Sequence, residues 1–148
     1  MTHILNRDER RALLADSRVV AVLGAHPNPI KPAFYVPDYL HQMGYRIIPV
    51  NATRVGETLF GTEVRANLGD IREPIDFVDI FRPSESLGGH LDDILAMQPL
   101  PRAVWLQLGI DDAAFVDRLV AAGIEVVRDA CALADHRAFG LPPIGPRG

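Results

Sequence analysis

The loop from Gly24 to Pro32 has the residue types of an anion-binding turn. It follows a short Val-rich run, and a pattern with helical spacing begins beyond it. Gly24 lets the backbone approach a ligand closely, the start of the helix offers N–H groups, and Lys31 adds a cation. Lys31 is the only lysine among 15 basic residues. The loop is predicted to bind phosphate through the following residues: Gly24, Ala25, His26, Asn28 and Lys31.

Two well-known phosphate-binding motifs do not fit this loop. The dinucleotide fingerprint Gly-x-Gly-x-x-Gly is not matched, because Gly24 is the only glycine in the segment. A Walker loop needs glycine directly before the lysine and Ser or Thr after it, but Ile30 and Pro32 occupy those positions. An ordinary strand-to-helix turn, stiffened by Pro27 and Pro29, remains the alternative.

Polar residues also follow the other apolar runs. Asn51 stands where an NAD site would place Asp or Glu on the ribose hydroxyls, and Arg54 is close behind it. This pair favours an adenosine that carries a ribose phosphate, as in coenzyme A (CoA) or NADP. Arg82, after Phe81, is placed to bind a pyrophosphate, and Gln107 ends an apolar run, where a buried amide needs a partner.

These residues require a sheet whose strands all end at one edge. Five short apolar runs are predicted to be buried strands: Val19 to Leu23, Arg46 to Val50, Ile75 to Phe81, Ala103 to Leu108 and Ile124 to Arg128. Longer segments with helical spacing precede, separate or follow them: Asn6 to Ala15, Ala33 to Met43, Ser84 to Met97, Asp111 to Ala122 and Cys131 to Ala138. Strands joined by helical crossovers run parallel. The fold class is therefore α/β, a Rossmann-like doubly wound, mainly parallel sheet of about five strands with helices on both faces.

Three local features add detail. Pro37 lies inside a predicted helix, so that helix is expected to start late or to kink. Ser84 is expected to cap the helix after Arg82, and Ala52 to Asp70 is expected to hold a hairpin or a short helix near Asn67.

Length and composition predict one domain over residues 1–140, followed by a flexible Pro/Gly-rich tail over residues 141–148. The net charge of -4 argues against general nucleic-acid binding, which usually needs a basic face. No apolar run reaches the ~20 residues of a membrane span, and the first residues lack a secretory signal. With a single cysteine, a cytoplasmic location is the expectation.

The blocks V-x-V-x-G-A-x-x-x-P-x-K-P, G-Y-x-x-x-P-V-N, I-D-x-V-x-I-F-R and A-V-W-L-Q-L-G follow one another at the predicted strand ends. In this order they resemble the small bacterial CoA-binding proteins, which in turn resemble the CoA-binding domain of succinyl-CoA synthetase α subunits. The resemblance implies a pyrophosphate over the loop from Gly24 to Lys31, adenosine near Asn51, and the pantetheine arm along Phe81 and Arg82.

The chain departs from that family pattern in places. His26 stands where the family usually has serine, and Ala33 where it often has serine. Ala130 replaces the arginine of the family's R-C-L-x-x-E-H segment.

The sequence contains no metal-ligand spacing among its five histidines and no nucleophile motif. A CoA-binding or acyl-CoA-binding protein without stand-alone catalysis is therefore expected, acting as a carrier, a sensor or a partner module. The alternative is an NAD(P)-binding oxidoreductase-type domain. A homodimer or a partner enzyme subunit is conceivable, and Cys131 is a candidate for a mixed disulfide with the CoA thiol.

Overall fold

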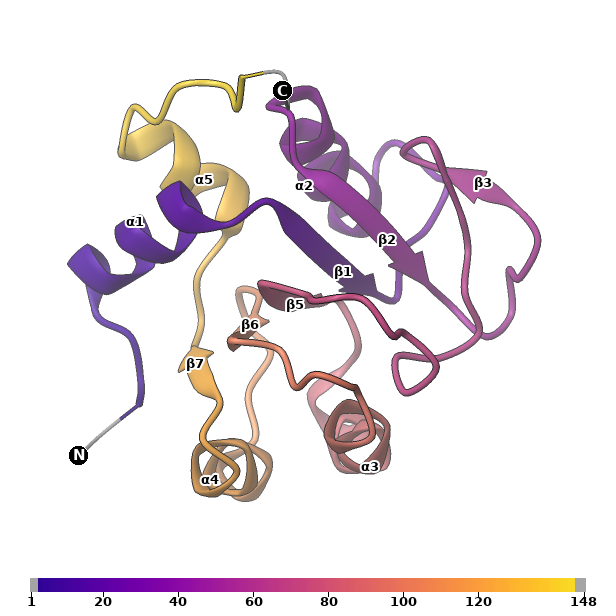
Figure 1. Ribbon diagram of the computed structural model, residues 1–148, viewed down its shortest axis with the longest axis vertical. Coiled ribbons are helices and arrows are strands. Elements are labelled where there is room, and N and C mark those ends of the chain that lie inside the picture. The colour runs from indigo at the N-terminus through magenta and orange to yellow at the C-terminus, as the bar shows by residue number, and fades with distance from the viewer. Residues whose placement is uncertain (1–2, 146–148) are drawn as a thin grey trace.

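A parallel sheet forms the centre of the computed structural model, which describes residues 3–145 (Figure 1). Its strands are β1 (Val19–Leu23), β2 (Arg46–Val50), β5 (Phe77–Ile80), β6 (Ala103–Leu106) and β7 (Glu125–Val127). They lie in the order β2-β1-β5-β6-β7, and every neighbouring pair is parallel. The predicted α/β class and the five-stranded parallel sheet are confirmed.

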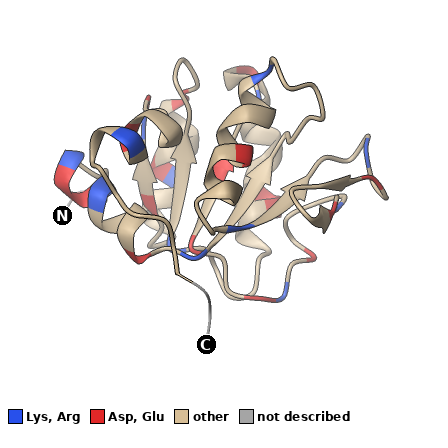
Figure 2. Cartoon of the chain, turned by 90° about the horizontal axis from the view of Figure 1, so that it is seen from above, with Lys and Arg blue, Asp and Glu red and all other residues tan. Residues whose placement is uncertain are grey.

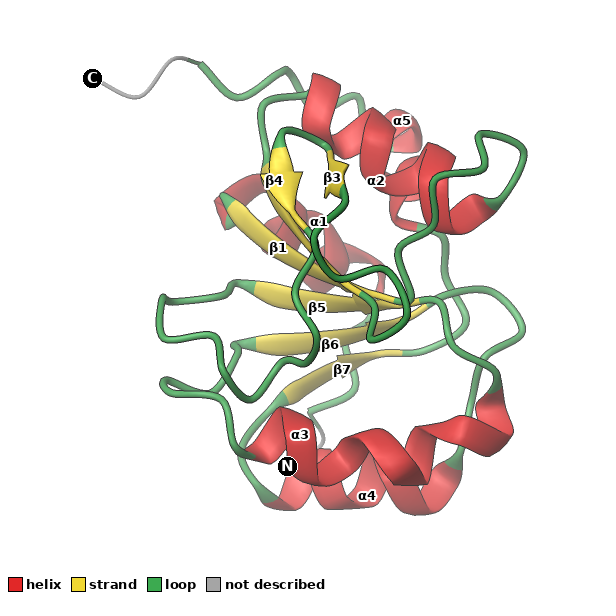
Figure 3. Ribbon diagram, turned by 90° about the vertical axis from the view of Figure 1, so that its right-hand side faces the viewer, coloured by secondary structure: helices red, strands yellow, loops and turns green. Residues whose placement is uncertain are grey.

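Helices cover both faces of this sheet (Figures 1 and 3). They are α1 (Arg7–Asp16), α2 (Pro32–Gln42), the 3-10 helix η1 (Ser84–His90), α3 (Leu91–Leu95), α4 (Ala113–Ala121) and α5 (Ala132–Ala138). One core contains Leu14, Leu40 and Ala132, from α1, α2 and α5. The other contains Ile94 and Leu119, from α3 and α4. Alternate residues of each strand enter opposite cores, which explains why the strands are mostly apolar.

The strand order places a topological switch point between β1 and β5. From β1 the chain crosses through α2 to β2 on one side, and from β2 it returns to β5 on the other side of β1. Ligands of open α/β sheets bind at the carboxyl ends of the strands where connections diverge in this way. The residues after Leu23 and Ile80 are therefore the first candidates for ligand binding.

Pro37 lies inside α2 without delaying its start at Pro32, because another segment uses the carbonyl that it leaves unpaired. A proline at this position cannot donate to the carbonyl of Ala33, four residues earlier. That carbonyl accepts the backbone N–H of His26 instead, at 3.3 Å. The proline thus allows the loop after β1 to bond to the helix that follows it.

The segment predicted as one helix from Ser84 to Met97 consists of η1 and the short α3. Its Gly88-Gly89 pair disfavours a continuous α-helix. The expectation that Ser84 caps this helix is wrong: its Oγ accepts the N–H of Asp111 at 3.0 Å and donates to the carbonyl of Gly109 at 3.4 Å. Ser84 therefore joins the ends of β5 and β6 rather than starting a helix.

The least regular segment contains the predicted hairpin, formed by the antiparallel strands β3 (Thr58–Leu59) and β4 (Thr62–Glu63). Asn67 lies in an irregular stretch and not in a helix. Residues 141–145 form no regular element, although the N–H of Ile144 donates to the carbonyl of Met43 at 2.7 Å. The flexibility of the tail stays a prediction, and residues 146–148 lie outside the described part of the chain. Within residues 3–145, no helix has the length and apolar character needed to cross a membrane.

Candidate functional site

Two cavities flank the switch point at the carboxyl edge of the sheet. The β2-side cavity, of about 350 Å³, is lined by Leu23, Gly24, His26, Val50, Asn51, Ala52, Thr53, Arg54, Ala66, Arg82, His90 and Asp93. The β6-side cavity, of about 320 Å³, is lined by Lys31, Pro32, Ala33, Tyr35, Val36, Phe81, Gln107, Leu108, Ile110 and Cys131. Eight of the ten residues singled out from the sequence line one cavity or the other. Ala25 and Asn28 line neither.

Gly24 lines the β2-side cavity and lies against Phe81, which lines the β6-side cavity. Its φ is +90°, a conformation that side chains strongly disfavour. A Cβ at this position would lie 3.2 Å from the carbonyl oxygen of Phe81 and from Cδ of Arg82. Glycine is therefore required here by backbone conformation and by contact.

The loop after Gly24 uses most of its backbone donors internally. The N–H of Lys31 bonds to the carbonyl of Asn28 at 3.0 Å, and the N–H of Ile30 bonds to the Asn28 side chain at 3.1 Å. Pro27, Pro29 and Pro32 have no N–H to offer. Asn28 thus holds the loop in shape, and an anion near it would depend mainly on cationic side chains.

The side chains of His26 and Arg54 lie close together, and each directs an N–H donor towards the other. The backbone N–H of Asn28 donates to Nδ1 of His26 at 3.0 Å, which places the proton of a neutral ring on Nε2. That Nε2 faces Nη2 of Arg54 at 3.2 Å. Two N–H groups cannot bond one another, so an acceptor that bridges both is the natural partner. A phosphate oxygen has this chemistry.

The β2-side cavity has a positive electrostatic character. Burial, followed by the charges of Lys31 and Arg54, lowers the pKa of His26. Burial and the nearby Arg82 lower the pKa of His90. Asp93, the acidic residue of the lining, accepts the N–H groups of Leu68 and Gly69 at 2.8 and 2.7 Å. Arg54 and Arg82 both line this cavity, whereas basic and acidic residues are interspersed over the chain as a whole (Figure 2).

Asn51 shapes the site through its own bonds. Its Nδ2 donates to the carbonyl of Ala25 at 2.9 Å, and its Oδ1 accepts the N–H of Thr53 at 3.0 Å. Asn51 therefore connects the loops that follow β1 and β2. This explains a neutral amide at a position where a diol-binding site would need a carboxylate.

The β6-side cavity has a largely apolar wall. Tyr35 and Leu108, which line it, are 45% and 64% exposed, so both side chains are accessible to a ligand. Gln107 is only 5% exposed and contributes a buried amide. Lys31 also lines this cavity, and its charge contributes to the lowered pKa of His26, which lines the other cavity. A long ligand with an anionic end and an apolar arm would match the two cavities in turn.

Some lining residues were not predicted from the sequence. His90 ends η1 and Asp93 lies in α3, and the helical spacing predicted for this segment did not indicate that either side chain lines a cavity. Tyr35 lies inside the predicted helix from Ala33 to Met43 and was not singled out as a site residue. Among residues 3–145, no group of His, Cys, Asp and Glu side chains has the arrangement of a metal site.

The parallel sheet, its switch point and its two cavities define a Rossmann-like α/β domain. The CoA-binding domain family matches residues 18–137, and the protein belongs to this family. The resemblance drawn from the strand-end blocks is thereby confirmed.

Comparisons with individual proteins agree with this assignment. The chain is 31% identical over 131 residues to the uncharacterized protein YneT of Bacillus subtilis, covering 88% of this chain and 94% of YneT. A Thermus thermophilus structure, cell-free ID.343, is 47% identical with a TM-score of 0.86, covering 91% of this chain and 99% of that one. Part of an acetyl-coenzyme A synthetase of Ca. Korarchaeum cryptofilum shares the fold, with 21% identity, a TM-score of 0.61, and coverage of 82% and 27%.

Proposed function

We propose that this protein binds CoA or an acyl-CoA across the switch point. The nucleotide and its phosphates occupy the β2-side cavity, and the pantetheine arm passes Phe81 into the β6-side cavity. The observation that carries the proposal is the pairing of a cationic cavity with an apolar one on either side of Gly24. Membership of the CoA-binding domain family supports it.

Within this proposal, ten residues form the site, in two roles. Eight line the cavities: Gly24, His26, Lys31, Asn51, Arg54, Phe81, Arg82 and Gln107. Ala25 and Asn28 shape the loop between them. We further propose a cytoplasmic carrier, sensor or partner module without catalysis of its own, because the cavities hold binding groups and no activated nucleophile has been identified among residues 3–145.

A thermal-shift panel of CoA, acetyl-CoA, NAD and NADP tests the proposal. Only a ligand that prefers the folded state raises the unfolding temperature, by an amount set by its concentration relative to Kd. We expect CoA or acetyl-CoA to raise it and the two dinucleotides to have little effect. A larger shift with NADP than with CoA would favour the oxidoreductase-type alternative instead.

Arg54→Ala is expected to reduce discrimination between CoA and dephospho-CoA. The donor pair of His26 and Arg54 would bind the ribose phosphate that dephospho-CoA lacks. Loss of one charge-assisted hydrogen bond should weaken CoA about 10-fold and leave dephospho-CoA nearly unchanged. Calorimetric titration with both ligands measures the difference. Arg102→Ala is the matched control, since Arg102 lies just before β6 at the opposite edge of the sheet. An equal loss of affinity for both ligands would mean that Arg54 binds the diphosphate and not the ribose phosphate.

Cys131 lies on the wall of the β6-side cavity, where the thiol end of the arm would arrive. When CoA disulfide is supplied, the Cys131 thiolate attacks one of its sulfurs, forming a mixed disulfide and releasing one CoA thiolate. Intact-mass spectrometry should therefore show one bound CoA that dithiothreitol removes, and no adduct with Cys131→Ser. An unmodified wild-type protein under the same conditions would contradict the hypothesis.

A further inference from the structure

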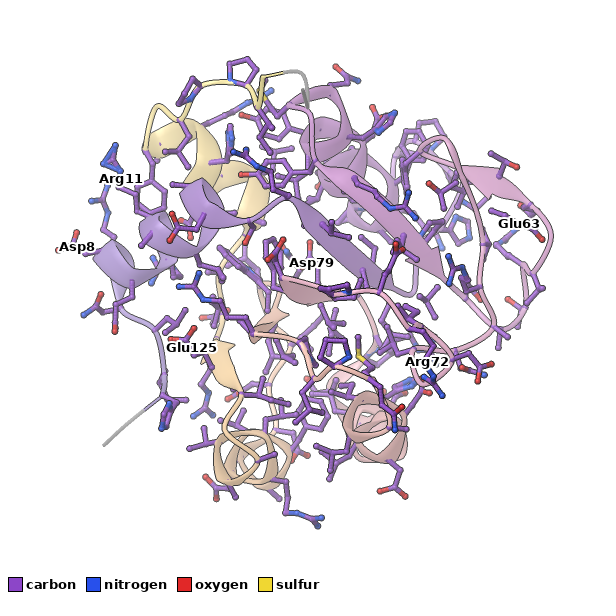
Figure 4. The ribbon with its side chains drawn as sticks, viewed as in Figure 1. Asp8, Arg11, Glu63, Arg72, Asp79 and Glu125 are labelled. Carbon is purple, nitrogen blue, oxygen red and sulfur yellow. The ribbon has the colours of Figure 1, made fainter. Side chains whose placement is uncertain are left out.

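A carboxyl group lies buried in the middle of the sheet, below the site. Asp79 of β5 is fully buried between Val22 of β1 and Trp105 of β6, near the centre of the view in Figure 4. Its Oδ1 accepts a hydrogen bond from Nε2 of Gln107 at 2.5 Å, and its Oδ2 has no partner among the described residues. A buried carboxyl with a free oxygen is costly to the fold, and an apolar residue would avoid the cost.

The bond to Asp79 sets the orientation of the Gln107 amide. A glutamine amide can rotate by half a turn and present either its nitrogen or its oxygen in a given direction. With Nε2 bonded to Asp79, Oε1 must face elsewhere. Oε1 accepts no hydrogen bond from residues 3–145. It is also not one of the fully buried polar atoms that lack a partner, so it is partly accessible. Gln107 lines the β6-side cavity, so Oε1 is the acceptor that its side chain can offer to a ligand there.

We propose that Gln107 binds an amide N–H of the pantetheine arm through Oε1, and that Asp79 is the positioning residue that orients it. This inference rests on the proposed function. It assigns to the β6-side cavity a specificity for ligands that carry an amide N–H. The other cavity-lining side chains here are mostly apolar, so an acceptor on the wall selects a ligand that offers a donor. The pantetheine arm carries amide groups along an otherwise flexible apolar chain and meets this requirement.

The test compares CoA with adenosine 3′,5′-bisphosphate, which has the nucleotide but lacks the arm. Gln107→Met keeps the approximate length of the side chain and removes the amide. We expect it to weaken CoA about 5- to 10-fold, the effect of one hydrogen bond, and to leave the bisphosphate unchanged within about twofold. Gln42→Met is the control. Gln42 bonds Asp38 on the exposed part of α2 at 2.8 Å, the same type of pair outside both cavities, and its loss should alter neither affinity.

Two substitutions of Asp79 separate positioning from packing. Asp79→Asn keeps an oxygen that accepts from Gln107 but adds an NH2 group that can hold the reversed amide, so its CoA affinity should lie between those of the wild type and Asp79→Leu. Asp79→Leu frees the amide to rotate, and CoA should weaken about as much as in Gln107→Met. Should Gln107→Met fold poorly, the double variant Asp79→Leu with Gln107→Met removes the whole polar pair, and the same comparison of ligands applies to it.

The outcomes are distinct. Selective loss of CoA affinity in Gln107→Met and Asp79→Leu, with a smaller selective loss in Asp79→Asn, establishes the inference. An unchanged CoA affinity in Gln107→Met, or a parallel loss of CoA and bisphosphate, overturns it while the proposed function stands. A wild-type protein that binds neither ligand overturns the proposed function itself.

Discussion

Asp79→Asn should change the pH dependence of stability more than any other single substitution in this chain. Burial raises the pKa of Asp79 from 3.8 to about 7, against the smaller opposing effect of its bond from Gln107. Between these values the folded protein holds a proton that the unfolded chain has released. The contribution of Asp79 to the free energy of unfolding is therefore largest below pH 4 and is lost as the pH rises to about 7. The loss is on the order of 4 kcal/mol.

Urea unfolding of wild type and variant between pH 4 and pH 8 measures this contribution as a difference. The wild type should lose stability relative to Asp79→Asn across the interval. Asp111→Asn provides the control, because the bond from Arg128 lowers the pKa of that exposed carboxyl. Its difference curve should have the opposite sign and stay below about 1 kcal/mol. Parallel curves for wild type and Asp79→Asn would show that Asp79 ionises normally.

Gly24→Ala is expected to destabilise the fold by about 3 kcal/mol and to abolish CoA binding. An alanine at a φ of +90° is strained by about 1 to 2 kcal/mol, and its Cβ would also press on the Phe81 carbonyl at 3.2 Å. That carbonyl belongs to backbone and cannot move aside without separating β1 from β5. The change would therefore displace Phe81 and Arg82, which line the two cavities.

Gly56→Ala gives the matched comparison for Gly24→Ala. Gly56 has a φ of +93°, almost the same conformation, but a Cβ there would meet nothing within 4 Å. Its cost should be the conformational strain alone, and CoA binding should persist. Chemical denaturation together with CoA titration of both variants separates the two effects. Equal losses for the two glycines would mean that contact with Phe81 contributes nothing.

The sheet was predictable because its strands are continuous apolar runs of the length of buried parallel strands. Only their ends differ: the run from Ala103 to Leu108 becomes a strand that stops at Leu106. Gln107 thereby emerges at the sheet edge, where its polarity had suggested a role. The helix expected from Ser84 was less predictable, because Ser84 bonds across to Gly109 and Asp111, residues far along the chain.

The candidate site was predictable as a set of strand-end residues and not as an arrangement of atoms. The helix start was expected to supply backbone donors, yet Asn28 and three prolines close the loop on itself. Asp79 carried a visible signal, since a single carboxylate interrupts the apolar run Phe-Val-Asp-Ile. Its partner, Gln107, lies 28 positions away, and only the pairing of β5 with β6 brings the two together.

His26, which stands where the family usually has serine, can contribute a different donor to a phosphate. Serine would supply one hydroxyl to a phosphate, whereas the imidazole supplies an N–H next to a guanidinium. In the free protein burial, followed by the charges of Lys31 and Arg54, lowers the pKa of His26. A bound phosphate would raise it, so CoA affinity should increase as the pH falls through the pKa of the complex.

A crystal structure with CoA bound tests the central claim most directly. We expect the adenine and ribose phosphate beside Asn51 and Arg54, the diphosphate passing Gly24 and Arg82, and the thiol near Cys131. Density for CoA on any other surface, or an arm that avoids the cavity lined by Gln107, would contradict it.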